Sequence, residues 1–101
     1  MGKMQRDKGA RFERWTSAKL NEYGIESRRG NVFYREDDVM TDSPLHVECK
    51  AQETTKIHEW MRQSIEAADG KIPVVIHKRN REEPLITMKF EDFLKLWKGE
   101  I

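Results

Sequence analysis

The sequence predicts an α/β fold in which a mixed β-sheet of four to five strands is flanked by helices, in the order α-β-β-β-α-β-β-α. Apolar and polar residues alternate from Leu45 to Lys50, as in a strand that buries one face. Residues 57–68 then carry apolar side chains at spacings of three and four, the pattern of an amphipathic helix. The apolar run from Ile72 to His77 follows directly, so we expect two parallel strands joined by a right-handed helical crossover.

The N-terminal part begins with a polar, basic segment, Met1 to Lys8, which we expect to be a flexible arm able to lie against a phosphate backbone. A helix is predicted from about Gly9 to Tyr23, and Gly24 stops it. Glu13 lies at the edge of the apolar stripe of this helix, where it either looks inward over the sheet or pairs in solvent with a neighbouring arginine. The apolar residues of that stripe are Phe12, Trp15, Leu20 and Tyr23.

Two strands are expected between this helix and residue 41. The first, Ile25 to Arg29, ends in two adjacent arginines, which are either phosphate contacts or a solvated strand edge. The second, about Val32 to Met40, contains an acidic run that includes Asp37 and Asp38. Neighbouring residues of a regular strand point to opposite faces, and a bulge would exchange them. The residues alone therefore leave open which aspartate faces a shared site.

The third strand follows a turn at Thr41-Asp42-Ser43-Pro44 and carries the chemistry. Leu45, Val47 and Cys49 point to the core, whereas His46, Glu48 and Lys50 share the opposite face, which an aspartate of the preceding strand can reach. Carboxylate oxygens hold Mg²⁺, and a nearby lysine can orient a water molecule and offset charge that develops on a phosphate. The pattern predicts a metal-dependent phosphodiesterase centre. The alternative is an ordinary ion pair between Glu48 and Lys50 on an exposed sheet face.

The C-terminal elements complete the sheet. Thr54 and Thr55 can cap the helix that follows the third strand. After a turn at residues 79–84, a closing strand from Leu85 to Met88 is expected to run antiparallel to its neighbour. A short amphipathic helix then presents apolar residues that cover either the sheet or a partner subunit, namely Phe90, Phe93, Leu94 and Trp97.

These residues resemble the core of the PD-(D/E)XK nuclease superfamily, whose fold is restriction-endonuclease-like. The resemblance rests on Asp38 followed by an apolar residue, a turn, and then Val47-Glu48-Cys49-Lys50. It extends to Lys8-Gly9-Ala10-Arg11-Phe12-Glu13 and to the strand at residues 72–78. Within the superfamily the chain is most similar to small phage and archaeal Holliday junction resolvase-like endonucleases, with VRR-NUC nucleases as close relatives. The family's aspartate usually precedes an apolar residue, which selects Asp38, and Asp37 then departs from the usual proline.

The resemblance implies an Mg²⁺-dependent DNA endonuclease, with Mn²⁺ as a substitute ion. Glu13, Asp38 and Glu48 would be the metal ligands together with the backbone carbonyl of Cys49, and Lys50 would position the attacking water. The implied substrate is branched DNA, above all the four-way junction, and the implied assembly is a symmetric homodimer. A nuclease for flap, single-stranded or linear duplex DNA shares this centre. A further alternative is a DNA-binding module that keeps the fold without catalysis.

Length and composition agree with this class of protein. A chain of 101 residues is expected to form one domain, and its single cysteine excludes an internal disulfide. We find no signal peptide, no apolar run of membrane-spanning length and no nucleotide-cofactor motif, so we expect a soluble cytoplasmic protein, consistent with phage origin in a bacterial host. The net charge is only +1, but a basic start and end flank an acidic middle. The expected DNA contacts are Arg11, Arg28, Arg29, Gln52, Lys78, Arg79 and Arg81.

Overall fold

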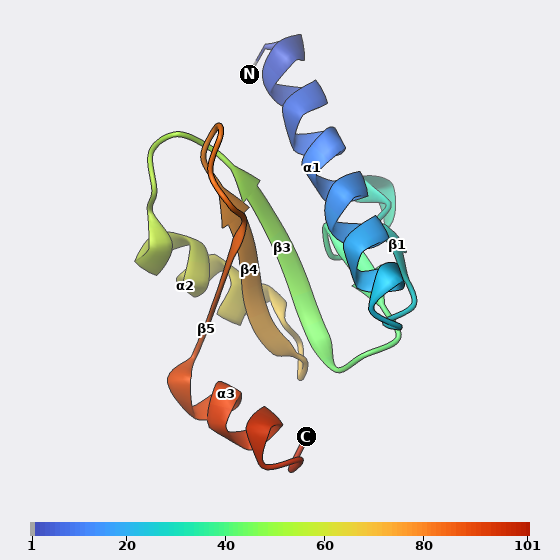
Figure 1. The fold of residues 1–101 in the computed structure, drawn as a ribbon, viewed down its shortest axis with the longest axis vertical. Helices are drawn as coiled ribbons and strands as arrows, with labels where there is room; N and C mark the ends of the chain where they lie inside the picture. The colour runs from blue at the N-terminus through green and yellow to red at the C-terminus, as the bar shows by residue number, and fades with distance from the viewer. Residues whose placement is uncertain (1) are drawn as a thin grey trace.

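A five-stranded mixed sheet forms the centre of the computed structural model, which describes residues 2–101 (Figure 1). One long helix covers one face of the sheet, and a second helix covers the other. The elements are α1 (Lys3–Glu22), β1 (Ser27–Arg29), the 3₁₀ helix η1 (Val32–Tyr34), β2 (Val39–Thr41), β3 (Leu45–Ala51), α2 (Ile57–Ala67), β4 (Ile72–Lys78), β5 (Leu85–Met88) and α3 (Phe90–Trp97). The predicted fold class and element order are confirmed.

The strands lie in sequence order from β1 to β5, and only the central pair is parallel. β3 and β4 align Glu48 with Val75, while β1 and β2, β2 and β3, and β4 and β5 pair antiparallel. This arrangement confirms the expected parallel pair around α2 and the antiparallel closing strand. It also places β3, the strand with the candidate chemistry, between β2 and β4 in the middle of the sheet.

Two separate hydrophobic clusters pack on the two faces of the sheet. On the α1 side, Val47 is packed with Val39 and Val74, and both Leu45 and Cys49 contact this cluster. On the α2 side, Trp60 and Met61 pack against Val75 of β4. The predicted inward face of β3 is therefore confirmed, and Glu48 and Lys50 belong to the opposite face, as expected from strand periodicity.

The N-terminal helix differs from the prediction in its start and in its buried stripe. α1 already begins at Lys3, so the predicted arm is helical from that residue, whereas Met1 lies outside the described residues. Lysine, glutamine and arginine are good helix formers, and the single Gly9 does not interrupt the helix. Of the expected stripe only Phe12 is fully buried, while Trp15 and Tyr23 are 43% and 76% exposed. Short polar side chains occupy the remaining buried positions, Thr16 and Ser17.

The predicted second strand is wrong over its first half. Val32–Tyr34 forms η1 instead, and β2 starts only at Val39. The side chain of Asn31 accepts a hydrogen bond from the Phe33 backbone N–H at 2.9 Å, which caps the turn. Arg35 then adopts a left-handed conformation with φ 53°. These local bonds override the strand propensity of the three apolar residues, which remain exposed.

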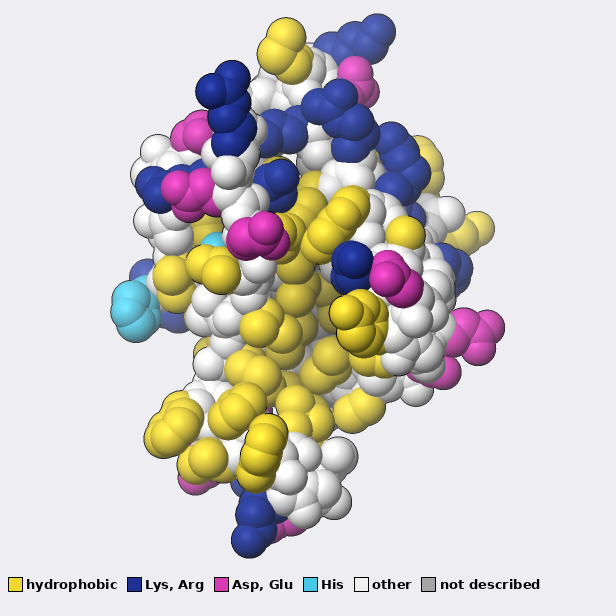
Figure 2. Space-filling model, in the orientation of Figure 1, with side chains coloured by type: hydrophobic (Ala, Val, Ile, Leu, Met, Phe, Trp, Pro, Cys, Tyr) yellow, Lys and Arg dark blue, Asp and Glu magenta, His cyan; other side chains and the backbone are white. Residues whose placement is uncertain are grey.

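The C-terminal helices also depart from expectation at particular points. α2 follows Lys56 without any side-chain cap, so Thr54 and Thr55 do not cap it. α3 has no fully buried residue, and its aromatic side chains do not cover the sheet; Trp97, for example, is 79% exposed. Apolar side chains gather on α3 at the lower end of the molecule (Figure 2). Among the described helices, none combines the length and apolar character that crossing a bilayer requires.

Candidate active site

A cleft of about 710 Å³ lies between α1 and the segment from β1 to the start of β2. Its wall on α1 includes Glu13, and its opposite wall includes Asp37 and Asp38. Three arginines also line it, Arg6, Arg28 and Arg29. The cleft thus combines carboxylates with guanidinium groups, the mixture that a metal-dependent phosphodiester site needs.

Asp38 is the carboxylate on which the charges of the other candidate residues act. Its Oδ2 atom accepts a hydrogen bond of 2.9 Å from the backbone N–H of Cys49, which ties the start of β2 to β3. Burial raises the pKa of Asp38 above its usual value, and the negative charges of Glu13 and Glu48 raise it further. The hydrogen bond from Cys49 and the positive charge of Lys50 lower the pKa but do not cancel the increase. The charges of the other three predicted catalytic residues, Glu13, Glu48 and Lys50, therefore all act on Asp38.

The two glutamates are each held by a basic side chain. Glu13 accepts a hydrogen bond of 2.9 Å from the Arg29 guanidinium. Glu48 Oε1 lies 3.1 Å from Nε2 of His46, a residue of the same strand and the same face.

Arg28, the second arginine of the cleft, is paired with Glu36. Arg28 forms two hydrogen bonds of 2.9 Å to Glu36, and these bonds, together with a bond from the Asn31 backbone N–H, lower the pKa of Glu36 to about 2. Arg28 and Arg29, two of the arginines expected to contact DNA, thus have carboxylate partners.

Asp37 belongs to a different set of contacts from Asp38. Its Oδ1 lies 2.8 Å from His46 Nδ1 without forming a hydrogen bond, and its Oδ2 lies 3.3 Å from Lys71 Nζ. His46 is only 3% exposed, so it is buried and does not line a solvent-open groove. Its pKa is raised, first by the bond to Glu48 and further by the charge of Asp37, against the opposing effect of burial. The two adjacent aspartates therefore have separate surroundings.

The donor set fits a hard divalent cation by its chemistry. Carboxylate oxygens from Glu13, Asp38 and Glu48 and the carbonyl of Cys49 are the ligand types that Mg²⁺ selects. Within residues 2–101, no three Asp, Glu, His or Cys side chains converge closely enough to form a ready-made metal site. Each of the three carboxylates instead accepts a bond from the protein. The Cys49 thiol is not a ligand candidate, because burial raises its pKa to about 12.

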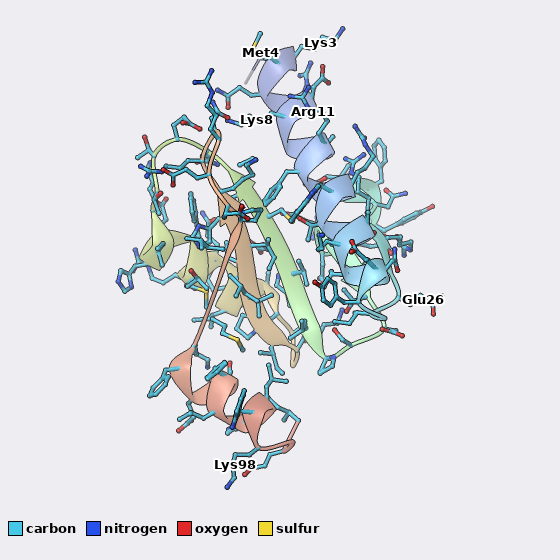
Figure 3. All side chains as sticks on the ribbon, in the orientation of Figure 1. Lys3, Met4, Lys8, Arg11, Glu26 and Lys98 are labelled. Atoms are coloured by element: carbon cyan, nitrogen blue, oxygen red, sulfur yellow. The ribbon has the colours of Figure 1, made fainter. Side chains whose placement is uncertain are left out.

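A second hollow, the basic groove, lies on another side of α1. It has a volume of about 450 Å³ and is lined by Lys8, Arg11, Phe12, Trp15, Ala51, Lys78, Asn80 and Pro84, with no carboxylate among them. Lys8 and Arg11 lie on the N-terminal half of α1 (Figure 3), and dark-blue side chains surround this end of the molecule (Figure 2). Two of the predicted DNA contacts, Arg11 and Lys78, thus share one groove. Arg28 and Arg29 line the cleft instead. The remaining three predicted contacts are exposed outside both hollows: Gln52, Arg79, which pairs with Glu82, and Arg81.

The sequence reasoning missed two features of this region. It did not assign Asp37 and Lys71 to a shared cluster with His46, and it did not place Lys8 and Trp15 in the basic groove. A histidine two residues before Glu48 on the same strand face was the available signal for the first feature. Nothing in the sequence spacing indicated the second, because the groove joins α1 to the distant hairpin of β4 and β5.

Comparison with known protein families is in accord with this geometry. A family model described as "Phage putative PDDEXK endonuclease" matches residues 4–100, nearly the whole chain. No curated protein sequence matches the chain. The predicted superfamily is confirmed, whereas the closer likeness to junction resolvases and VRR-NUC nucleases stays a prediction. The chain therefore belongs to the family of phage PD-(D/E)XK endonucleases, to which hydrolysis of phosphodiester bonds is ascribed.

Proposed function

We propose that this protein is an Mg²⁺-dependent DNA endonuclease that acts on branched DNA, above all on the four-way junction. The observation that carries the proposal is that the charges of Glu13, Glu48 and Lys50 all act on the buried carboxylate of Asp38. Such crowding of negative charge is unfavourable in a protein without a cation, and it is the arrangement that a metal-dependent nuclease requires. Membership of a PD-(D/E)XK endonuclease family supports the same chemistry.

The roles of the residues follow from their chemistry and position. Glu13, Asp38 and Glu48 would hold Mg²⁺ or Mn²⁺ together with the Cys49 carbonyl, and the ion when bound supplies Lewis-acid stabilisation of the phosphate and a more acidic water. Lys50 orients the attacking water and offsets the charge that develops on the phosphate. Burial of Asp38 keeps its carboxylate fixed on the Cys49 N–H, so one ligand is preorganised.

DNA binding would use both sides of α1. Arg28 and Arg29 face the cleft, where the scissile phosphate has to lie. Arg11 and Lys78 in the basic groove, with Gln52, Arg79 and Arg81 near the same end of the sheet, would contact phosphates farther along the substrate. Cations placed around an acidic centre, rather than at it, allow the same surface to hold both a metal ion and a polyanion.

The proposed assembly is a homodimer, because two symmetric nicks in a four-way junction need two centres related by a two-fold axis. The exposed apolar side chains of α3 support this assembly, since a surface of that kind is typical of protein interfaces. The intracellular location and phage origin proposed for the protein follow from its family and its substrate.

The direct test is Mg²⁺-dependent cleavage of a labelled four-way junction beside flap, single-stranded and linear duplex DNA, with Glu48→Ala as the control. We expect paired nicks in the junction from the wild type and none from the variant. Cleavage of the other substrates in preference to the junction would keep the centre and reject junction specificity. Tight DNA binding without cleavage in Mg²⁺ or Mn²⁺ would instead identify a non-catalytic binding module.

A further inference from the structure

We propose that His46 is a positioning residue that holds Glu48 in the orientation needed for metal binding. The inference rests on the proposed function, because it assigns a role toward the ion that Glu48 is proposed to hold. It concerns a side chain that neither touches the substrate nor binds the ion itself.

The contacts of His46 belong to a row of four side chains that runs from Lys71 through Asp37 and His46 to Glu48, of which Lys71 is partly exposed. Lys71 Nζ lies 3.3 Å from Asp37 Oδ2, Asp37 Oδ1 lies 2.8 Å from His46 Nδ1, and His46 Nε2 lies 3.1 Å from Glu48 Oε1. The imidazole is 3% exposed and therefore has little freedom to leave this position. The carboxylates of Asp37 and Glu48 are 11% and 16% exposed, so both are largely removed from water.

The contact with His46 leaves the Oε2 atom of Glu48 open to another partner. His46 engages Oε1, and among residues 2–101 no hydrogen bond or ion pair engages Oε2. A carboxylate that is fixed through one oxygen and open at the other is restricted in rotation without being blocked as a ligand. Partners that orient metal ligands in this way commonly change metal affinity or activity by about 10- to 100-fold when they are removed.

These contacts also give the two adjacent aspartates before β2 different partners. The charges of Glu13 and Lys50 act on Asp38, whereas Asp37 lies beside the far nitrogen of the imidazole and is itself paired with Lys71. The burial of His46 and its bond to Glu48 are what orient the ring, because no hydrogen bond forms at Nδ1. Asp38 is thus a proposed metal ligand, whereas Asp37 lies behind the residue proposed to position Glu48.

Two amide substitutions separate the two ends of the imidazole. In His46→Gln the side-chain nitrogen falls near the former Nε2 and can still donate to Glu48, whereas in His46→Asn it falls near the former Nδ1 and reaches only toward Asp37. Both variants replace a buried ring with a smaller amide, so we expect similar losses of thermal stability. Mn²⁺ binding without DNA, measured by isothermal titration calorimetry, should be near wild type for His46→Gln and roughly 10- to 100-fold weaker for His46→Asn.

A second readout and a matched control complete the test. The Mg²⁺ concentration for half-maximal DNA cleavage should rise by a similar factor in His46→Asn, with a smaller change in the rate at saturating Mg²⁺. His77→Gln is the control, because His77 is also buried but bonds Thr87, away from the carboxylates. It should lower the melting temperature and leave Mn²⁺ affinity unchanged.

The outcomes distinguish this inference from the proposed function. Wild-type Mn²⁺ affinity in His46→Asn, or an equal loss in both His46 variants, would overturn the positioning role, because the effect would not follow the donor that faces Glu48. If the wild type binds no Mn²⁺, or if Glu48→Gln binds it as tightly as the wild type, the metal centre itself is rejected. In that case the positioning role falls with it.

Discussion

Asp38 is an acid in a place that disfavours its charge. Burial, reinforced by the charges of Glu13 and Glu48, raises the pKa of Asp38 above its ordinary value of 3.8 in the folded protein. In the unfolded chain the pKa returns to that ordinary value, so folding without a cation becomes less favourable as the pH rises through the raised pKa. The ionised side chain is thus retained at a cost in stability, which is typical of functional carboxylates.

The substitution Asp38→Asn should therefore stabilise the protein while it abolishes cleavage. The amide oxygen can still accept the Cys49 N–H bond but carries no charge, so in EDTA at pH 7 we expect the melting temperature to rise by a few degrees, or about 1 kcal/mol. The difference from wild type should shrink as the pH falls toward 4. Cleavage should fall on the order of 10³-fold or more, since one carboxylate ligand is lost.

Asp42→Asn is the control for this prediction, because Asp42 is an exposed acid outside the cleft. It should change neither the melting temperature nor the cleavage rate appreciably. A lower melting temperature for Asp38→Asn at every pH would show that the charge of Asp38 stabilises the metal-free fold, contrary to our account. Thermal unfolding followed by circular dichroism across pH 4–8 measures the effect.

At the level of elements, the approach of β1 to the acidic segment depends on the absence of a side chain at Gly30. A Cβ atom there would lie 1.7 Å from the carbonyl oxygen of Asp37, and the Gly30 N–H donates to the Asp38 carbonyl at 2.9 Å. The backbone between Asp37 and Asp38 is thus held directly against the end of β1. No small shift of a flexible side chain can relieve such a clash with backbone.

Gly30→Ala should therefore displace the aspartates and destabilise the fold by about 2 kcal/mol or more, with loss of cleavage. Gly9→Ala offers a matched contrast, because Gly9 lies inside α1 and a Cβ there meets nothing within 4 Å. It should stabilise the protein by about 0.5–1 kcal/mol through helix propensity. Urea unfolding of both variants tests the pair, and an unchanged midpoint for Gly30→Ala would contradict the close packing described here.

Strands and helices with a clear apolar period were easier to predict than local turns. The alternation in β3 and the stripe of α2 each had one strong period, and the structure buries Val47, Trp60 and Met61 accordingly. Residues 32–34 misled the prediction because their strand propensity is opposed by a single Asn31 cap, which propensity does not register. The electrostatic effect of Glu13 on Asp38 was predictable only from the family pattern, and the contacts of His46 depended on side-chain directions that a strand period alone does not give.

Over the molecule as a whole, basic and apolar surface side chains are concentrated at opposite ends. The chain measures 41 × 26 × 26 Å, with basic side chains concentrated near the N-terminal half of α1 and apolar side chains on α3 at the opposite end (Figure 2). A polyanion and a protein partner would therefore approach from different directions. This separation allows a dimer to form without covering the cleft.

We expect the wild type to sediment at about twice the chain mass of 12.0 kDa at micromolar concentration, and Trp97→Asp to sediment as a single chain. A buried aspartate at an apolar interface carries an unpaired charge, which is strongly unfavourable. Tyr23→Asp is the control, because Tyr23, directly after the end of α1, is similarly exposed but lies outside the apolar end. Analytical ultracentrifugation decides the question, and a wild-type monomer at tens of micromolar would reject the dimer.

The parallel pairing of β3 with β4 also has a consequence for the synthesis of the protein. All four proposed catalytic residues precede residue 51, yet β3, which carries two of them, lies between β2 and a strand that ends at Lys78. A ribosome-bound chain that has exposed the first 51 residues therefore holds every reactive group but lacks the partner strand that fixes Glu48 and Lys50. We expect nascent and prematurely terminated chains to be inert, so that nuclease activity arises only after the second half of the polypeptide has emerged.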